Sequence, residues 1–171
     1  MQNESIPVAL ARESLEYYLA KGELLSAAAV DDAVLTPPAG VFVSLKKQGR
    51  LRGCIGTIQP TQATTAKEII QNAVNAATSD PRFSPVKRDE IDGLTIWVDI
   101  LGQPERIDSV EELNPKDYGV IVRCGRRSGL LLPDLEGVDS VEEQVAIARQ
   151  KAGIGQDEKI ELYRFIVTRY K

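Results

Sequence analysis

The stretch "GRLRGCIGT", from Gly49 to Thr57, contains one of the two cysteines of the chain, Cys54. Arg52 precedes this cysteine by two residues. Positive charge close to a thiol favours the thiolate, which is the nucleophilic form. One hypothesis is therefore a reactive Cys54. The alternative is a structural cysteine, because free cysteine is among the most buried residue types and packs as a small hydrophobic residue.

Two glycines, Gly53 and Gly56, flank the cysteine in the same stretch. Glycine weakens a strand interior unless a bulge, a neighbouring backbone or a ligand needs the space. The spacing of the glycines matches neither a P-loop nor a dinucleotide-binding loop. These positions therefore predict either close packing or a place where a ligand approaches the strand.

A second motif, "SDPRFSP" from Ser79 to Pro85, places Asp80 and Arg82 on a loop that two prolines stiffen. The pair can form a charge-assisted bond that fixes the loop, or the guanidinium can bind a carboxylate or phosphate. If this pair meets Arg52 and Cys54 in the fold, the group forms an anion-accepting pocket with a thiol at its edge.

Histidine is absent from the 171 residues. This absence excludes Ser-His-Asp and Cys-His arrangements, zinc sites with histidine ligands and the usual proton shuttle near neutral pH. A nucleophilic Cys54 would need a carboxylate, an amine or a substrate group as its proton acceptor. No cluster has the spacing of metal ligands, and we expect neither a metal nor a cofactor.

The composition is that of a soluble globular protein, with 43% apolar and 27% charged residues. The net charge of -4 disfavours nucleic-acid binding, and the basic "RCGRR" stretch, from Arg123 to Arg127, fits a solvated hairpin turn better than a nucleic-acid contact. The N-terminus lacks a signal-peptide pattern, and no apolar run approaches the roughly 20 residues of a membrane span. We expect a cytoplasmic protein with reduced thiols and no membrane association.

Periodicity and capping signals predict an α+β fold with a largely antiparallel sheet packed by helices. We expect a single domain over residues 1–171. The hairpin around Gly49 has two possible registers, because its turn residues suit a two-residue loop and its apolar pattern suits a three-residue loop. The expected helices are Ser5 to Lys21, about 13 residues from a capping box at Thr65–Glu68, a single turn at Ser109–Glu112, and Ser140 to Ala152. The expected strands are Val41–Lys46, Leu51–Ile55, Leu94–Leu101, a hairpin within Gly119–Pro133, and a terminal strand Lys159–Arg169.

Six segments together resemble the AMMECR domain family, and more closely its bacterial branch, AmmeMemoRadiSam system protein A. They run in family order over about residues 38 to 155: "GVFVSLKKQGRLRGCIGT", "NAVNAATSDPRFSPV", "PERI", "GVIV", "GLLLP" and "VEEQVAIARQKAGI". The resemblance implies an α+β fold with an antiparallel sheet, a smaller second lobe and motif residues near a cleft. It implies a pathway shared with a radical-SAM enzyme and a Memo-like protein, and it implies no established activity for this chain.

The leading hypothesis is an accessory or regulatory binding protein. It would recognise a small anionic ligand or a partner protein through a cleft lined by the "LRGCIGT" and "DPRF" segments, with Arg52, Gly53, Gly56, Asp80 and Arg82 as binding residues. The alternative is a cysteine-dependent enzyme with Cys54 as the nucleophile. A third hypothesis, nucleic-acid binding through the basic turns, is disfavoured by the acidic composition.

Overall fold

The structure, a computed structural model, describes residues 4–27, 30 and 32–171. The chain divides into two compact units, of which unit 1 comprises Met1–Ile100 with Thr168–Lys171 and unit 2 comprises Leu101–Val167. The polypeptide thus leaves unit 1, builds unit 2 and returns to unit 1 for its last strand. The expectation of a single domain over residues 1–171 stays a prediction.

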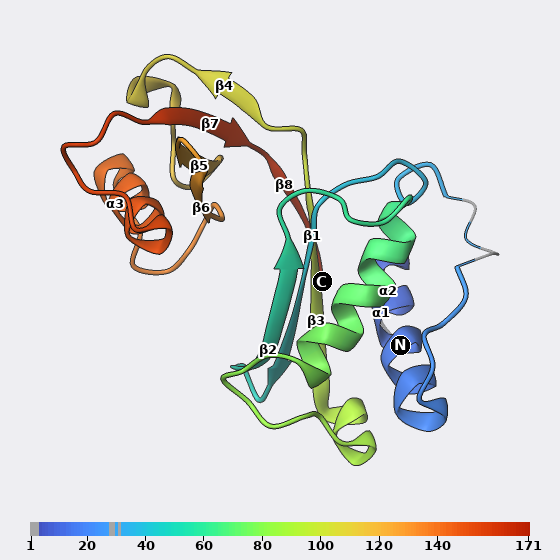
Figure 1. The fold of residues 1–171 in the computed structure, drawn as a ribbon. Coiled ribbons are helices and arrows are strands. Elements are labelled where there is room, and N and C mark those ends of the chain that lie inside the picture. Colours follow the sequence, from blue (N-terminus) through green and yellow to red (C-terminus); the bar gives the residue numbers. More distant parts are fainter. Residues whose placement is uncertain (1–3, 28–29, 31) are drawn as a thin grey trace. The chain divides into compact units, whose positions relative to one another are not determined.

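Unit 1 is a four-stranded sheet with helices on one face (Figure 1). Its elements are α1 Ile6–Lys21, β1 Val41–Lys47, β2 Arg50–Thr57, α2 Thr65–Thr78, the 3-10 helix η1 Arg88–Gly93, β3 Leu94–Leu101 and β8 Val167–Tyr170. The strand order is β2-β1-β3-β8, and β1 pairs antiparallel with both β2 and β3.

No helix among the described residues is both long enough and apolar enough to cross a membrane.

Strand alternation separates the two faces of this sheet. Helix α2 packs against β1 and β2, and the strand residues on that side are fully buried with residues of α1 and α2. They are Val41, Val43 and Leu45 on β1 and Ile96 and Val98 on β3. Because successive strand side chains point to opposite faces, the intervening residues lie on the face away from the helices. These include Phe42, Ser44, Lys46 and Trp97, all of them half-buried.

The β1–β2 hairpin satisfies both register signals at once. Gln48 and Gly49 have positive φ angles of 51° and 76°, which suits a two-residue type I′ turn closed by the pair Lys47 and Arg50. Further along, Leu45 pairs with Gly53, as the apolar pattern requires. A bulge between these two regions leaves Arg52 without a partner residue on β1. The predicted hairpin is therefore confirmed, with one extra residue absorbed at Arg52.

The start of α2 corrects one detail of the sequence analysis. Thr64 is the N-cap residue, and its hydroxyl accepts the backbone N–H of Lys67 at 3.2 Å. The predicted capping box of Thr65 and Glu68 is wrong, because the Glu68 carboxylate is buried and is occupied by donors from outside the helix. The predicted first helix is confirmed as α1, which ends at Gly22 with a φ of 75°.

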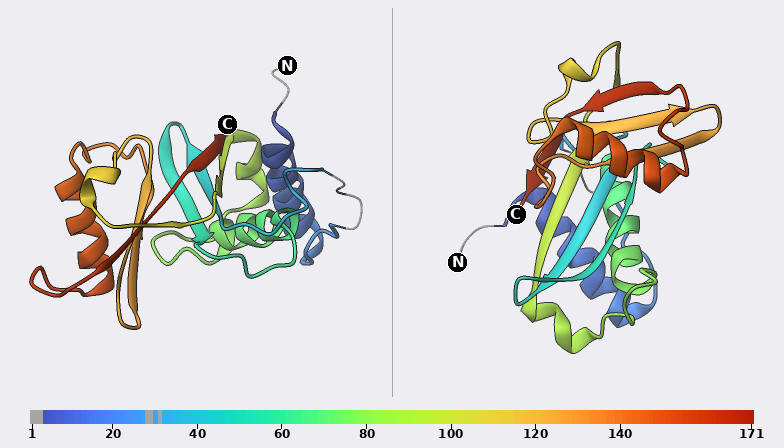
Figure 2. Two further views of the ribbon diagram at one scale, coloured as in Figure 1. Left: turned by 90° about the horizontal axis from the view of Figure 1, so that it is seen from above. Right: turned by 90° about the vertical axis from the view of Figure 1, so that its left-hand side faces the viewer.

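Unit 2 is a second four-stranded antiparallel sheet, in the order β4-β7-β5-β6, with α3 packed against β5 and β6 (Figure 2). The predicted turn, hairpin and helix are confirmed, including capping boxes at Ser109 and Ser140. The elements are β4 Glu105–Ile107, the 3-10 helix η2 Val110–Glu112, β5 Gly119–Cys124, β6 Arg127–Leu131, α3 Val141–Ala152 and β7 Glu161–Phe165.

The predicted single terminal strand is wrong. It consists of two strands, β7 in the sheet of unit 2 and β8 in the sheet of unit 1. The break falls at Ile166, whose carbonyl oxygen accepts the N–H of Gly102 at 2.8 Å. Both halves are extended, so alternation alone did not reveal that they belong to different sheets.

Candidate functional site

Side chains of the "DPRF" loop occupy the free edge of β2 at Cys54. The backbone N–H of Cys54 donates to Asp80 Oδ2 at 2.9 Å, and Arg82 Nη2 donates to the Cys54 carbonyl oxygen at 3.4 Å. An edge strand normally leaves such groups open to solvent or to another chain. The structure thus brings the three predicted residues together and shows that the loop closes the edge of β2 beside the cysteine.

The Asp80–Arg82 pair is held by several bonds. Arg82 donates from Nε to Oδ1 at 3.0 Å and from Nη2 to Oδ2 at 2.7 Å, and its backbone N–H reaches Oδ1 at 3.1 Å. The Asp80 side chain is only 2% exposed. The Arg82 hydrogen bonds, aided by the Cys54 N–H and opposed by burial, hold the pKa of Asp80 far below its usual range. The carboxylate is therefore a poor proton acceptor, and its contacts support the loop-fixing interpretation.

Arg52 anchors the far end of the same loop. Its guanidinium makes two hydrogen bonds to Glu90, at 3.2 and 3.0 Å, and one to the Ser84 carbonyl oxygen at 2.9 Å. Glu90 also accepts from Lys47 at 2.9 Å. The hydrogen bond from Arg52, followed by those from the Lys87 backbone and Lys47, lowers the pKa of Glu90 to about 2. Arg52 and Cys54 therefore lie on one strand but have separate partners.

The two glycines of the motif are explained by packing. A Cβ atom at Gly53 would lie 2.2 Å from the backbone carbonyl oxygen of Ala76 in α2. A Cβ atom at Gly56 would lie 2.2 Å from the ring of Phe42 on β1. Gly53 lets α2 approach the sheet, and Gly56 makes room for the phenyl ring. Both contacts are internal to unit 1, and they account for the glycines without a ligand.

The Cys54 thiol is half-buried, and the hydroxyl of Ser44 on β1 donates to its Sγ at 3.2 Å. The carboxylate of Asp80 accepts hydrogen bonds from the Cys54 backbone N–H and from Arg82. Within residues 4–27, 30 and 32–171, no group of three or more cysteine and carboxylate side chains is placed to hold a metal ion.

A cleft of about 510 Å³ lies along the loop and reaches the "LRGC" strand. Its lining contains two cations and two carboxylates, so the charges are balanced. Phe83 adds a half-buried aromatic ring. Because Arg52 already bonds Glu90, this cleft suits a ligand with both charges or a protein segment better than a simple anion. The lining residues are Arg52, Phe83, Ser84, Pro85, Lys87, Asp89 and Glu90.

The basic "RCGRR" turn of unit 2 is also partly engaged. Arg127 forms a short ion pair with Glu158 and donates to the Gly153 carbonyl oxygen at 2.7 Å. The Arg123 guanidinium lies 5.0 Å from the ring centroid of Tyr163. These contacts agree with the structural interpretation of the turn, and the expectation that it does not bind nucleic acid stays untested.

Sequence analysis missed a buried carboxylate, Glu68, at the other end of β2. Its oxygens accept hydrogen bonds from the Thr57 hydroxyl at 2.6 Å, the Thr61 hydroxyl and N–H at 2.8 Å, and the Gln62 N–H at 2.7 Å. Asn72 continues the network to the Thr57 hydroxyl. The network ties the segment after β2 to α2. The sequence signal was present but assigned to capping, because a glutamate three residues after a threonine is typical of a capping box.

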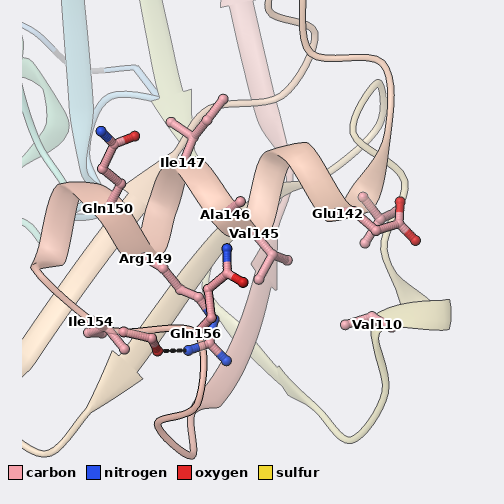
Figure 3. A pocket seen from close by; sticks show the side chains of 11 residues that line it. Val110, Glu142, Val145, Ala146, Ile147, Arg149, Gln150, Ile154 and Gln156 are labelled. Atoms are coloured by element: carbon pink, nitrogen blue, oxygen red, sulfur yellow. Dashed lines mark hydrogen bonds between the residues drawn. The ribbon is translucent and has the colours of Figure 1, made fainter.

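A second hollow, of about 760 Å³, lies in unit 2 along α3 (Figure 3). Aliphatic side chains of α3 and Val110 line much of it. Arg149 crosses its lower side and donates to the Gly155 carbonyl oxygen, as the dashed line in Figure 3 marks. The remaining lining residues are Val141, Glu142, Val145, Ala146, Ile147, Gln150, Ile154 and Gln156. No motif residue of "LRGCIGT" or "DPRF" belongs to it.

The fold and the site define a class of protein. It is an α+β protein with two antiparallel sheets, in which a "DPR" loop covers the edge of the "LRGC" strand. The chain belongs to the AMMECR1 family, whose model matches residues 8–170. The fold class predicted from the sequence is confirmed, as is the resemblance at the level of the family.

Relatives with similar sequences come from bacteria and archaea. A protein of Thermotoga maritima is 52% identical over 160 residues, covering 92% of each chain. A protein of Clostridium acetobutylicum is 51% identical over 166 residues, but this chain spans only 35% of its length. The crystal structure of an uncharacterised protein from Pyrococcus horikoshii matches with a TM-score of 0.85 and 34% identity, covering 95% of this chain and 88% of that one.

Proposed function

We propose that this protein is an accessory binding protein that recognises a small polar ligand or a partner protein through the cleft beside the "LRGC" strand. The observation that carries the proposal is the arrangement of Arg52. This side chain forms one wall of the cleft and is fixed by Glu90 and by a loop carbonyl oxygen before any ligand arrives. A wall fixed in advance lowers the ordering cost of binding.

The rim of the cleft offers the groups that a ligand would contact. Lys87 and Asp89 are exposed, and Phe83, which also lines the cleft, is half-buried. A zwitterionic or mixed-charge partner with an apolar part complements such a lining better than a bare anion does. The small anionic ligand expected from the sequence is therefore less well supported at this place than a mixed-charge one.

Within the AMMECR1 family, we infer that this protein is of the AmmeMemoRadiSam system protein A type. It would have an accessory role in the cytoplasm, in a pathway with a radical-SAM enzyme and a Memo-like protein. The six sequence segments support this assignment. The alternative of a Cys54 nucleophile gains no support from the contacts, because Asp80 is occupied by Arg82 and the Cys54 backbone.

A ligand-stabilisation screen tests the proposal. The melting temperature of the full chain is measured with and without amino acids, dipeptides and dicarboxylates. The shift that each compound causes is compared among wild type, Lys87→Ala and Lys67→Ala. Lys67 is an exposed lysine on α2 and serves as the matched control. We expect at least one mixed-charge compound to raise the melting temperature of wild type and Lys67→Ala but not of Lys87→Ala. Stabilisation that is equal in all three proteins would contradict binding in this cleft.

A further inference from the structure

The face of unit 1 away from its helices carries an unusual group of cations around one tryptophan. The Nζ atom of Lys46 lies 3.3 Å from the ring centroid of Trp97, and that of Lys171 lies 4.4 Å from it. The Arg169 guanidinium carbon lies 5.4 Å from the same centroid. We call this surface the Trp97 face, made of Ser44, Lys46, Trp97, Arg169 and Lys171.

Among the residues that the structure describes, one of the three cations, Arg169, has a carboxylate partner on this face. Arg169 donates to Asp99 Oδ1 at 2.7 Å and Oδ2 at 3.0 Å, and Asp99 is buried. This pair is neutral as a unit. In the described part of the chain, neither Lys46 nor Lys171 has a side-chain carboxylate within ion-pair distance.

The two ammonium groups therefore lie near one ring, and neither is paired with a side-chain carboxylate of the described residues. The two Nζ atoms lie 3.3 and 4.4 Å from the same centroid, so they cannot be more than about 8 Å apart. This is about the screening length at physiological ionic strength, so the two charges repel each other. The attraction of each for the indole holds it over the ring but does not neutralise its charge. An anionic group within reach of both would relieve the repulsion and accept charge-assisted hydrogen bonds from them.

Neighbouring groups on the same face can add to such a site. Ser44 lies directly beside Trp97 in the sheet, and Cys54 lies on the other side of Ser44. The row Trp97, Ser44, Cys54 thus runs across three adjacent strands. Sequence analysis expected this thiol at the edge of an anion pocket if Arg52, Cys54, Asp80 and Arg82 came together. In the structure it also lies in the same row as this cation group.

We propose that the Trp97 face binds a small polyvalent anion, with its phosphoryl or carboxylate groups contacted by the ammonium groups of Lys46 and Lys171 beside the indole. The site is separate from the cleft beside the "LRGC" strand, since the two share no lining residue. The proposal therefore stands or falls independently of the function proposed above.

The test uses Trp97, which is the only tryptophan of the chain. Pyrophosphate and citrate are titrated separately into the full chain at constant ionic strength, with KCl as the filler, and tryptophan emission and melting temperature are recorded. We expect a saturable response to at least one of them. A response to pyrophosphate alone identifies phosphoryl recognition, one to citrate alone identifies carboxylate recognition, and a response to both identifies the shared charge.

Lysine variants locate the response. Lys46→Gln and Lys171→Gln should each raise the Kd by about tenfold or more, whereas Lys46→Arg should retain binding within about threefold. Lys67→Gln, on the helical side, and Lys87→Ala, in the cleft, should leave the Kd unchanged. Far-UV circular dichroism checks folding, and Lys171→Gln alone decides the matter if Lys46→Gln does not fold. The proposal is overturned if neither anion produces a saturable response, or if the folded lysine variants bind as wild type does.

Discussion

Arg52 and Glu90 lie 38 residues apart in the sequence and are joined by two hydrogen bonds of 3.2 and 3.0 Å. The pair fastens the loop after α2 to the strand that contains Cys54. An arginine that sequence analysis assigned to ligand binding is thus engaged in holding the cleft wall. Its partner Glu90 has a lowered pKa, and this connects the architecture of the site to the acid stability of the protein.

Stability should fall with acid through Glu90. Its pKa in the folded state is about 2, below the ordinary 4.5, so the folded state favours the ionised form. The resulting stabilisation is present above pH 4.5 and is lost as the pH falls toward 2. We expect Glu90→Gln to be less stable than wild type by about 1–2 kcal/mol at pH 7, with the difference vanishing near pH 2. Urea unfolding at pH 7, 4 and 2.5 measures this, and a pH-independent difference would contradict the role of the ionised pair.

Asp80→Ala should open the edge of β2. The substitution leaves the Cys54 N–H without its acceptor and removes the partner of Arg82. We expect a loss of about 2–4 kcal/mol in the free energy of unfolding. The control is Asp92→Ala, at an exposed position of η1, which should change stability by less than about 0.5 kcal/mol. Faster hydrogen exchange of the Cys54 amide in Asp80→Ala would locate the effect, and unchanged exchange there would argue against it.

Gly53→Ala tests the packing of α2 on the sheet. The new methyl group would meet the Ala76 carbonyl oxygen at 2.2 Å, and a backbone atom cannot move aside without shifting the helix. We expect destabilisation by about 3 kcal/mol or a failure to fold. Gly93→Ala is the control, because nothing lies within 4 Å of the corresponding Cβ position. Equal melting temperatures of the two variants would show that close helix packing is not the reason for the glycine.

Glu68→Gln tests the buried network behind β2. Four donors point at the two carboxylate oxygens, and the amide of glutamine would turn one of these acceptors into another donor. We expect a loss of about 2–3 kcal/mol. Glu16→Gln, at an exposed position of α1, provides the matched comparison in chemical denaturation. A variant as stable as wild type would mean that the network contributes little.

Local signals in the sequence predicted most elements. Apolar residues alternate from Leu94 to Ile100, and the structure has the predicted strand with the bounds Leu94–Leu101. Ser140 and Glu143 form a reciprocal capping box, so the start of α3 was fixed by residues three positions apart. Such elements are predictable because the residues that determine them are neighbours in the chain.

The site was harder to predict where its partners are far apart in sequence. The Asp80–Arg82 bond was one of the two possibilities predicted for that loop, whereas the partner of Arg52, Glu90, lies 38 residues away and was not predicted. Trp97 was read only as a strand residue, since its cations come from β1 and from the chain end after β8. Glutamate and lysine side chains can serve as caps, ion pairs or solvent-exposed charges, and only the fold decides among these roles.

Amide chemical-shift mapping tests most directly whether the cleft beside the "LRGC" strand is the binding surface. The uniformly ¹⁵N-labelled chain is titrated with the compound that stabilises it most in the thermal screen. We predict that the largest saturable shifts occur at Arg52 and at residues 83–90. Shifts concentrated along α3 in unit 2, with residues 83–90 unaffected, would contradict the proposed function.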